Sequence, residues 1–272
     1  PPVKRIVSTL LADMGLPDSV TMFMNYPTRY DNRDTARALK GSGIKCPELE
    51  NYAPVIWDYW ERNLDPDLFV DHSLEGNVGG KVVLITGASS GIGKTSALRL
   101  AEAGAHVLLV ARSAEKLEET AAEIATVGGV ATIYQADVSD LADCDRLVAE
   151  VLENHGFIDI LLNNAGRSIR RSLELSYDRF HDFERTMQIN YFGAIRLTMG
   201  LLPSMAERGT GHIINMSSIS ALTPSPRFSA YVASKSALDA WTRAAAVEYS
   251  DLNVRFTTIN MPLVRTPMIE AT

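Results

Sequence analysis

The alternation of short apolar runs with longer amphipathic stretches, from Lys81 onward, constrains the fold of this chain more than any other feature. The pattern predicts helices over residues 91–103, 114–127, 140–154, 176–208 and 230–250. Between the helices lie six runs rich in β-branched residues and bounded by turn residues, as strands are: KVVLIT, HVLLVA, ATIYQAD, IDILLNNAG, HIINMSS and VRFTTINMP. Strands separated by helices form right-handed βαβ units. The sequence therefore predicts an α/β fold with a doubly wound parallel sheet, whose strands direct their carboxyl ends toward a ligand.

The segment before residue 79 has a different composition, richer in Pro, Tyr, Trp and Asp. It contains two predicted helices, near residues 34–40 and 51–64, and no grouping of catalytic residue types. We therefore expect an N-terminal helical extension over 1–78 and one α/β domain over 79–272. The chain does not begin with methionine and stops soon after its sixth strand, so we expect it to be a piece of a longer polypeptide, with the α/β domain truncated at its C-terminus.

Composition excludes several classes of function. The chain of 272 residues has a net charge of −7, which gives no electrostatic reason to expect nucleic acid as a partner. Its two cysteines, Cys46 and Cys144, show no CxxC spacing and no ligand grouping with the five histidines, so we expect no metal and a reducing compartment, the cytoplasm. No apolar run approaches the roughly 18 residues that a transmembrane helix needs.

The glycine-rich stretch LITGASSGIGKTSAL, residues 84–98, fits two phosphate-binding patterns. In the first, a relaxed Walker A loop, Lys94 and Thr95 serve a nucleoside triphosphate and magnesium. That loop needs an acidic residue at the end of a neighbouring strand, whereas IDILLNNAG offers only the uncharged Asn163 and Asn164. The loop alone does not decide between an NTPase and a dehydrogenase.

The second pattern is a dinucleotide-binding turn in which each glycine has a separate structural role. Gly87 permits the tight turn, Gly91 lets the backbone approach a pyrophosphate, and Gly93 lets the following helix lie close to the strand. The helix beginning near Gly91 then directs its free N–H groups toward the negative charge.

Three residues further along favour the dehydrogenase. Tyr231 and Lys235 are four residues apart, so a helix places both on one face, and Ser218 ends a strand thirteen residues before Tyr231. A nearby ammonium group should lower the tyrosine pKa and make the phenol a general acid or base near neutral pH. The alternative is an ordinary exposed helix face, which the combination with the glycine turn disfavours.

Together these motifs resemble those of the short-chain dehydrogenase/reductase family. The matching residues are TGASSGIG, NNAG at 163–166, Asn190 in MQINYFGA, Ser218 and YVASK, in order and spacing over residues 79–272. The resemblance implies a Rossmann sheet, a nicotinamide cofactor and a catalytic set of Asn190, Ser218, Tyr231 and Lys235. Tyr231 would give its proton to the substrate oxygen, Ser218 would hydrogen-bond that oxygen, and Asn190 would hold a water leading to Lys235.

The resemblance also implies a set of cofactor contacts. The residues at the matching positions are Gly87, Ser89, Ser90, Gly91, Ile92, Gly93, Asp137, Val138, Asn164, Ala165, Gly166, Tyr231, Lys235 and Thr266. Cofactor choice depends on the end of the second strand, where NAD enzymes place a carboxylate for the ribose 2′-hydroxyl. Here that strand ends in Ala111 and Arg112, and a guanidinium can pair with a 2′-phosphate. We therefore expect NADPH rather than NADH, although an ordinary solvated cation would also explain Arg112.

The substrate is suggested only by a narrower resemblance, to bacterial fatty acyl-CoA reductases of this family. It rests on the stretches 163–197 and 227–241 and on MPLVRTPMI, where Pro262 is followed by Leu263 instead of the family's usual glycine. It implies reduction of a long-chain acyl-CoA to the aldehyde, and on to the alcohol in the longer protein, with residues 1–78 as the tail of a preceding reductase module. The tentative substrate contacts are Arg167, Arg170, Arg171 and Arg227 for the CoA phosphates, and Leu263, Leu222, Phe228 and Met268 for the acyl chain.

Two other functions stay open. The same fold can reduce a free aldehyde or ketone, in which case the arginines are solvated or intersubunit cations. A dinucleotide-binding module without turnover belongs to another class, which the intact set of Ser218, Tyr231 and Lys235 disfavours. Family members commonly pair through their long helices, so the resemblance also implies a homo-oligomer.

Overall fold

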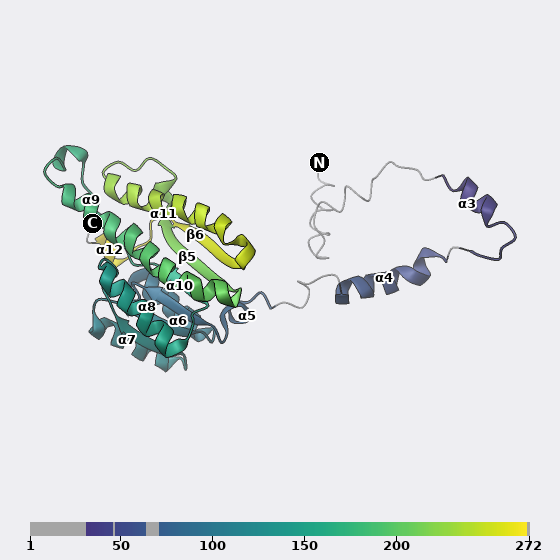
Figure 1. Cartoon of the computed structure of the whole chain (residues 1–272), viewed down its shortest axis with the longest axis horizontal. Helices are drawn as coiled ribbons and strands as arrows, with labels where there is room; N and C mark the ends of the chain where they lie inside the picture. The colour runs from purple at the N-terminus through teal and green to yellow at the C-terminus, as the bar shows by residue number, and fades with distance from the viewer. Residues whose placement is uncertain (1–30, 46, 64–70, 271–272) are drawn as a thin grey trace. The chain divides into compact units, whose positions relative to one another are not determined.

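The structure is a computed structural model that describes residues 31–45, 47–63 and 71–270 (Figure 1). The chain divides into two units, Pro1–Leu68 and Phe69–Thr272. Cys46 and residues 1–30 lie outside the described residues.

Two helices make up the described part of the first unit. They are α3, Arg33–Ala38, and α4, Leu49–Asn63, close to the ranges that the sequence predicts. On α4, the rings of Trp57 and Trp60 lie 5.4 Å apart, and Arg62 bonds Asp58 one turn earlier at 2.8 Å.

A six-stranded sheet, all parallel, forms the centre of the second unit, in the order β3-β2-β1-β4-β5-β6. The strands are β1 Val82–Thr86, β2 His106–Ala111, β3 Val130–Gln135, β4 Ile160–Asn163, β5 Gly211–Ser218 and β6 Val254–Met261. The long helices that connect them are α6 Gly91–Glu102, α7 Ala114–Thr126, α8 Leu141–His155, α10 Gly193–Arg208 and α11 Ser229–Glu248. The order reverses between β1 and β4, where such sheets bind ligands. The predicted doubly wound fold is confirmed.

Each face of the sheet has its own hydrophobic core because successive side chains of a strand point to opposite faces. Leu84 belongs to the core that α8 and α10 cover, whereas its neighbours Val83 and Ile85 belong to the core under α6 and α7. The short helix α5, Leu74–Val78, contributes Val78 to the second core and is thus part of this unit.

The helix predicted over residues 176–208 is interrupted, and it begins later. The chain forms a 3-10 turn at Leu173–Leu175, α9 at Phe180–Met187, and a π-helical turn at Gln188–Phe192 that leads into α10. Ser176 explains the late start, because its hydroxyl donates to the carbonyl of Ser172 (2.8 Å) and stabilises a turn in place of the helix.

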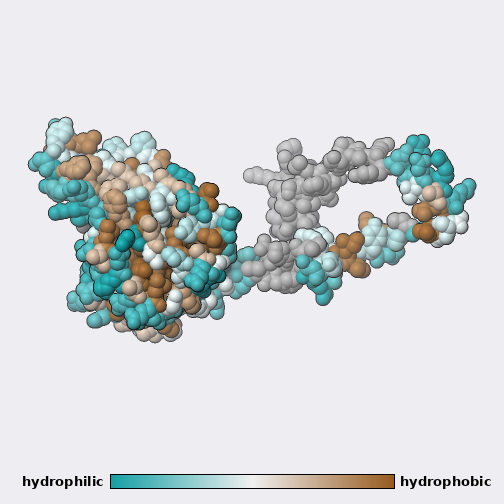
Figure 2. Space-filling view, in the orientation of Figure 1, coloured by the Kyte–Doolittle hydropathy of each residue, from teal (hydrophilic) through white to brown (hydrophobic). Residues whose placement is uncertain are grey.

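The surface of the second unit mixes polar and apolar side chains, and Figure 2 shows apolar ones gathered along α10 on the visible face. Phe192 and Met199, at the start and middle of this stretch, are exposed. Within the described ranges, no helix combines the length and apolar character required to cross a membrane.

Candidate active site

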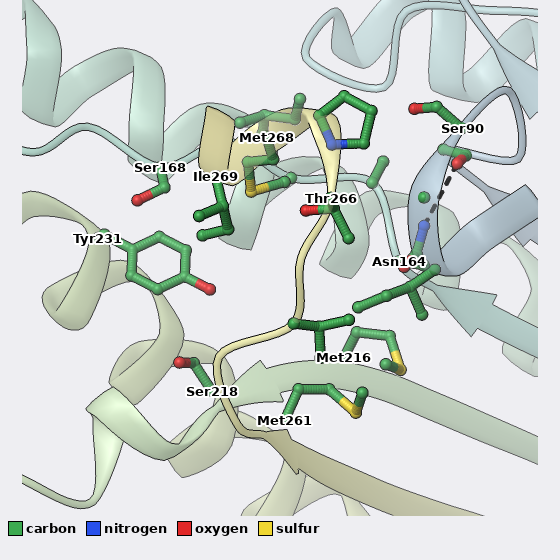
Figure 3. A pocket seen from close by; sticks show the side chains of 18 of the residues that line it. Ser90, Asn164, Ser168, Met216, Ser218, Tyr231, Met261, Thr266, Met268 and Ile269 are labelled. Atoms are coloured by element: carbon green, nitrogen blue, oxygen red, sulfur yellow. Dashed lines mark hydrogen bonds between the residues drawn. The ribbon is translucent and has the colours of Figure 1, made fainter. Parts of the chain in front are cut away.

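A cavity of about 720 Å³ opens at the carboxyl edge of the sheet, and the segments that follow all six strands form its walls. This size is typical of small-molecule sites, which run about 300–1,000 Å³. Figure 3 shows Tyr231 and Ser218 on one side of the cavity and Ser90 and Asn164 on the other, with Thr266 between them. The predicted site residues that line it are Gly87, Ser89, Ser90, Gly91, Ile92, Arg112, Asp137, Val138, Asn164, Ala165, Gly166, Ser218, Tyr231, Lys235, Leu263 and Thr266.

The glycine turn between β1 and α6 has the geometry of a dinucleotide cradle. Gly87 and Gly91 have φ values of +69° and +54°, which residues with a side chain rarely adopt. A Cβ on Gly93 would collide with the carbonyl oxygen of Gly87, so this glycine lets α6 lie against the turn. Asn164 fixes the turn from the end of β4, donating from Nδ2 to the Thr86 carbonyl at 2.9 Å.

Lys94 and Thr95 do not form a triphosphate site. The side chain of Lys94 does not enter the cavity and instead pairs with Glu123 on α7, with 2.7 Å between Nζ and Oε1. Both residues lie in the first turns of α6 and neither lines the cavity. The Walker A interpretation is therefore excluded by the direction of the lysine side chain.

Ser218 and Tyr231 bring a hydroxyl and a phenol to one side of the cavity. Ser218 ends β5, and its Oγ accepts from the backbone N–H of Ser220 (3.2 Å) and from the Ser220 hydroxyl (2.9 Å). Burial raises the pKa of Tyr231 above its usual 10.0, and hydrogen bonding with Ser218 opposes this only in part. The expected lowering of the Tyr231 pKa is thus wrong, because desolvation of the phenolate outweighs any attraction from Lys235.

Lys235 is buried, with its ammonium group directed at the end of β5. Nζ donates to the carbonyl of Met216 at 2.6 Å, and a Cβ on Gly166 would lie 3.6 Å from it. Burial lowers the pKa of Lys235 to about 8, and the negative charge of Asp239, one turn along α11, opposes this shift. At neutral pH both Lys235 and Tyr231 therefore hold their protons.

Asn190 lies in the π-helical turn, behind the cavity rather than on its wall. Its side-chain oxygen accepts from the backbone N–H of Arg167 (2.9 Å), and its nitrogen donates to the Arg167 carbonyl (3.0 Å) and to the Ser234 hydroxyl (2.9 Å). The amide thus joins the loop after β4 to α11, next to Lys235. The water that sequence analysis assigned to it remains an expectation.

The far end of the cavity, next to β2 and β3, carries the predicted cofactor-choice residue. Arg112 is 74% exposed, and its nearest carboxylate oxygen is that of Asp137 at 3.9 Å. Asp137 is itself engaged, since its Oδ1 accepts from the N–H (2.9 Å) and hydroxyl (2.7 Å) of Ser139. Lys116, in the first turn of α7, also lines this end and was missed by sequence analysis. The sequence does contain a signal for Lys116. It lies four residues after Arg112, in the first turn of the helix that follows β2, and such a turn faces the cavity.

The four arginines predicted for the substrate do not line the large cavity. Arg171 and Arg227 border a separate small cavity of about 10 Å³, and Arg167 and Arg170 are exposed outside. Leu263 does line the large cavity, together with a set of apolar residues that sequence analysis named only in part: Met216, Ile219, Phe228, Met261, Met268 and Ile269. This part of the wall suits an apolar ligand.

Within the described residues, no group of three or more His, Cys, Asp or Glu side chains is placed to hold a metal ion.

Comparison with known proteins identifies the family. Residues 81–272 match the model of the family described as short chain dehydrogenase. The chain belongs to the short-chain dehydrogenase/reductase family. Sequence analysis reached the same family from its motifs, and that prediction is confirmed.

Individual relatives of this family carry names that narrow the comparison. The chain is 58% identical over 196 residues to a fatty acyl-CoA reductase of Acinetobacter baylyi, covering 72% of this chain and 66% of that protein. It is 48% identical over 194 residues to a fatty acyl-CoA reductase of Mycobacterium tuberculosis, covering 71% and 66%. A metagenomic short-chain oxidoreductase solved in complex with NADP is 33% identical, with a TM-score of 0.64, covering 67% of this chain and 82% of that one. The chain thus spans just under two thirds of the length of these two curated relatives.

The family's nicotinamide dinucleotide fits the residues present. The backbone of the glycine turn and the N-terminus of α6 face the cavity, where free N–H groups suit a pyrophosphate. The closeness of Gly93 to the Gly87 carbonyl leaves no room for a side chain at this cradle.

Proposed function

We propose that the protein reduces a long-chain fatty acyl-CoA to the fatty aldehyde, with NADPH as the reductant. One observation carries the proposal: a single cavity joins Ser218, Tyr231 and Lys235 to the glycine turn and to an apolar wall. The names of two relatives, 58% and 48% identical, support an acyl-CoA as the substrate.

A bound reduced nicotinamide would supply a hydride to the carbonyl carbon. The residues of the chain act on the carbonyl oxygen, where negative charge develops. Ser218, oriented by Ser220, donates a hydrogen bond to this oxygen, and Tyr231 gives it a proton. The raised pKa of Tyr231 keeps the phenol protonated at neutral pH, as a proton donor requires. The resulting hemithioacetal then releases the CoA thiol and leaves the aldehyde.

Direct reduction of the thioester suits the cysteine content of the site. Enzymes that first transfer an acyl group to themselves need a thiolate in the active site. Cys144 lies on the buried face of α8, and burial raises its pKa to about 12. It cannot act as that nucleophile near neutral pH.

Preference for NADPH over NADH rests on Arg112 and Lys116, two cations at the end of the cavity where the adenosine ribose would lie. A guanidinium paired with a 2′-phosphate contributes about 1.5–3 kcal/mol, which corresponds to about 10–100-fold in affinity. Replacement of Arg112 by Ala should weaken NADPH binding by this factor and leave NADH binding unchanged. The control is Arg99→Ala, on α6 and away from the cavity lining. Equal catalytic efficiency of the unmodified protein with the two cofactors would remove this part of the proposal.

The substrate is tested by following NADPH oxidation with palmitoyl-CoA and the release of free thiol in parallel. We expect one thiol per acyl-CoA reduced, and loss of both signals in Tyr231→Phe. Turnover with hexadecanal but never with palmitoyl-CoA would favour the reductase of free aldehydes. NADPH binding without turnover of either compound would favour the non-catalytic module.

Two further parts of the proposal concern assembly. We propose that the part of the predicted 1–78 extension in the first unit, Pro1–Leu68, is the tail of a preceding reductase module, and that copies of the chain associate through α10 and α11. The exposed Phe192 and Met199 support the second point. A monomeric mass by light scattering, unchanged by Met199→Glu, would contradict it.

A further inference from the structure

A backbone hydrogen bond ties together two segments of the cavity wall. The N–H of Arg171, in the loop after β4, donates to the carbonyl of Arg227 at 2.7 Å. Ser168, three residues before Arg171, lines the large cavity, and so do Pro226 and Phe228 on either side of Arg227. This bond therefore sets the separation of the two segments near Tyr231, which lies in the first turn of α11.

The second segment is held in a conformation that its sequence does not favour. Arg227 has a φ of +71°, in the left-handed region, where a long side chain is strained. Such a conformation persists only when surrounding contacts enforce it. The bond from Arg171 is one such contact, so whatever fixes Arg171 also fixes Arg227.

The side chain of Arg171 lies next to a buried carboxylate. Asp182, in the first turn of α9, lies 3.5 Å from Nε of Arg171 and accepts from Nε of Arg179 at 2.9 Å. His181 completes the group, 3.3 Å from the other carboxylate oxygen. The side chain of Asp182 is only 8% exposed, and the hydrogen bond from Arg179 holds its pKa below the usual value.

The small cavity lies between the loop after β4, the start of α9 and the segment around Arg227. Arg171, Asp182 and Arg227 border it together with Ile169, Ser176, Phe183, Ser229 and Ala230. Its volume of about 10 Å³ is near the lower limit for a cavity that can hold one water molecule. The side chain of Arg171 is partly exposed, but its Nε is buried at this cavity and faces the carboxylate of Asp182.

We propose that Asp182 is a positioning residue for the substrate. Acting through Arg171, it holds the strained segment around Arg227 against the loop after β4. It thereby sets the distance between these two segments of the cavity wall beside Tyr231. Arg171 thereby has a role different from the CoA contact that sequence analysis gave it. The inference rests on the proposed function for its effect on the substrate, and on the structure alone for its effect on the backbone.

The first arm of the test is hydrogen exchange and needs no turnover. Loss of an ion pair to a partly exposed side chain changes an equilibrium by up to about fivefold, so in Asp182→Asn we expect the Arg171 amide to exchange about two- to fivefold faster. The matched control is Asp178→Asn, an exposed acid four residues earlier, which should leave this amide unchanged. An Arg171 amide that exchanges equally slowly in both variants would overturn the proposal.

The second arm is kinetic. In Asp182→Asn we expect KM for the acyl-CoA to rise about three- to tenfold, with kcat within about twofold and the dissociation constant of NADPH unchanged. Glycine adopts the φ of Arg227 without strain, so the double variant Asp182→Asn/Arg227→Gly should recover most of the KM loss. If the Arg171 amide exchanges faster but KM is unchanged, Asp182 has only a structural role and its positioning role is refuted. If the unmodified protein turns over neither substrate, the proposed function fails, while the exchange arm still decides on the contact.

Discussion

Replacement of Lys235 by methionine should make the folded protein more stable at neutral pH while it removes activity. Lys235 is 4% exposed, and burial lowers its pKa from 10.5 to about 8. A shift of this size corresponds to about 3 kcal/mol by which the folded state disfavours the charged amine. Methionine fills a similar volume without a charge, so it removes this penalty. It also removes the hydrogen bond to the Met216 carbonyl, which subtracts about 1 kcal/mol.

The sign of the pH dependence follows from which state holds the proton. Below pH 8, Lys235 is protonated in both the folded and the unfolded chain, and the full penalty applies. Between pH 8 and 10.5 the unfolded chain keeps the proton and the folded chain loses it, so the stability of the unmodified protein rises with pH. We therefore expect Lys235→Met to be more stable by about 2 kcal/mol at pH 7, and to lose this advantage between pH 8 and 10.

The assay is urea unfolding at pH 7, 8, 9 and 10, followed by tryptophan fluorescence, for the unmodified protein and for Lys235→Met. Burial raises the pKa of Tyr231 above 10.0 and that of Cys144 to about 12, so in the folded state both groups keep their protons through pH 9 in the two proteins and add little to the difference there. Lys116→Met is the control, because an exposed lysine should give no pH-dependent difference. A difference that stays constant from pH 7 to 10, or a Lys235→Met protein that is less stable at pH 7, would refute the reasoning.

Three more changes have outcomes that the structure predicts. Gly93→Ala should destabilise the protein by about 1–3 kcal/mol in urea unfolding and weaken NADPH binding in a fluorescence titration, because the new Cβ collides with the turn; unchanged binding would contradict the cradle. Cys144, whose pKa burial raises to about 12, should resist iodoacetamide at pH 8 until urea unfolds the chain; rapid labelling of the native protein, located by peptide mass, would show that it is accessible. Asp159 accepts from the backbone of β1 at 2.9 Å and from Arg208 at 3.0 Å, so Asp159→Ala should lower the unfolding free energy by about 1–3 kcal/mol; the exposed Asp251→Ala is the control.

The sheet was predictable from sequence because parallel strands covered on both faces are nearly continuous apolar runs. In VVLIT, Val83, Leu84 and Ile85 are buried apolar residues, and the polar Thr86 comes only at the end of the strand. The glycine turn was predictable for a different reason, since Gly87 and Gly91 adopt φ values that few other residues tolerate. In both cases the local sequence carries the physical constraint by itself.

The helix break before α10 was not predictable, because its causes are tertiary. The π-helical turn at Gln188–Phe192 holds Asn190 against the backbone of Arg167 and the hydroxyl of Ser234, both remote in sequence. The arginines illustrate the same limit. Sequence places Arg171 just after a cofactor-lining motif, but its side chain direction is set by Asp182, a contact that no periodicity shows.

Desolvation also explains why the pKa of Tyr231 differs from the sequence expectation, and it suggests how the site favours proton transfer. Before reaction, Lys235 carries a buried positive charge that Asp239 compensates only in part, while Tyr231 is neutral. In the proposed reaction Tyr231 gives up its proton, and the phenolate would then place a negative charge one helical turn from the ammonium group, on the same face of α11. The attraction between the ammonium group and the phenolate then offsets the free-energy cost of burying each charge. The attraction exists only after the proton has begun to move, so it stabilises the transition state more than the ground state, which is the condition for a faster reaction.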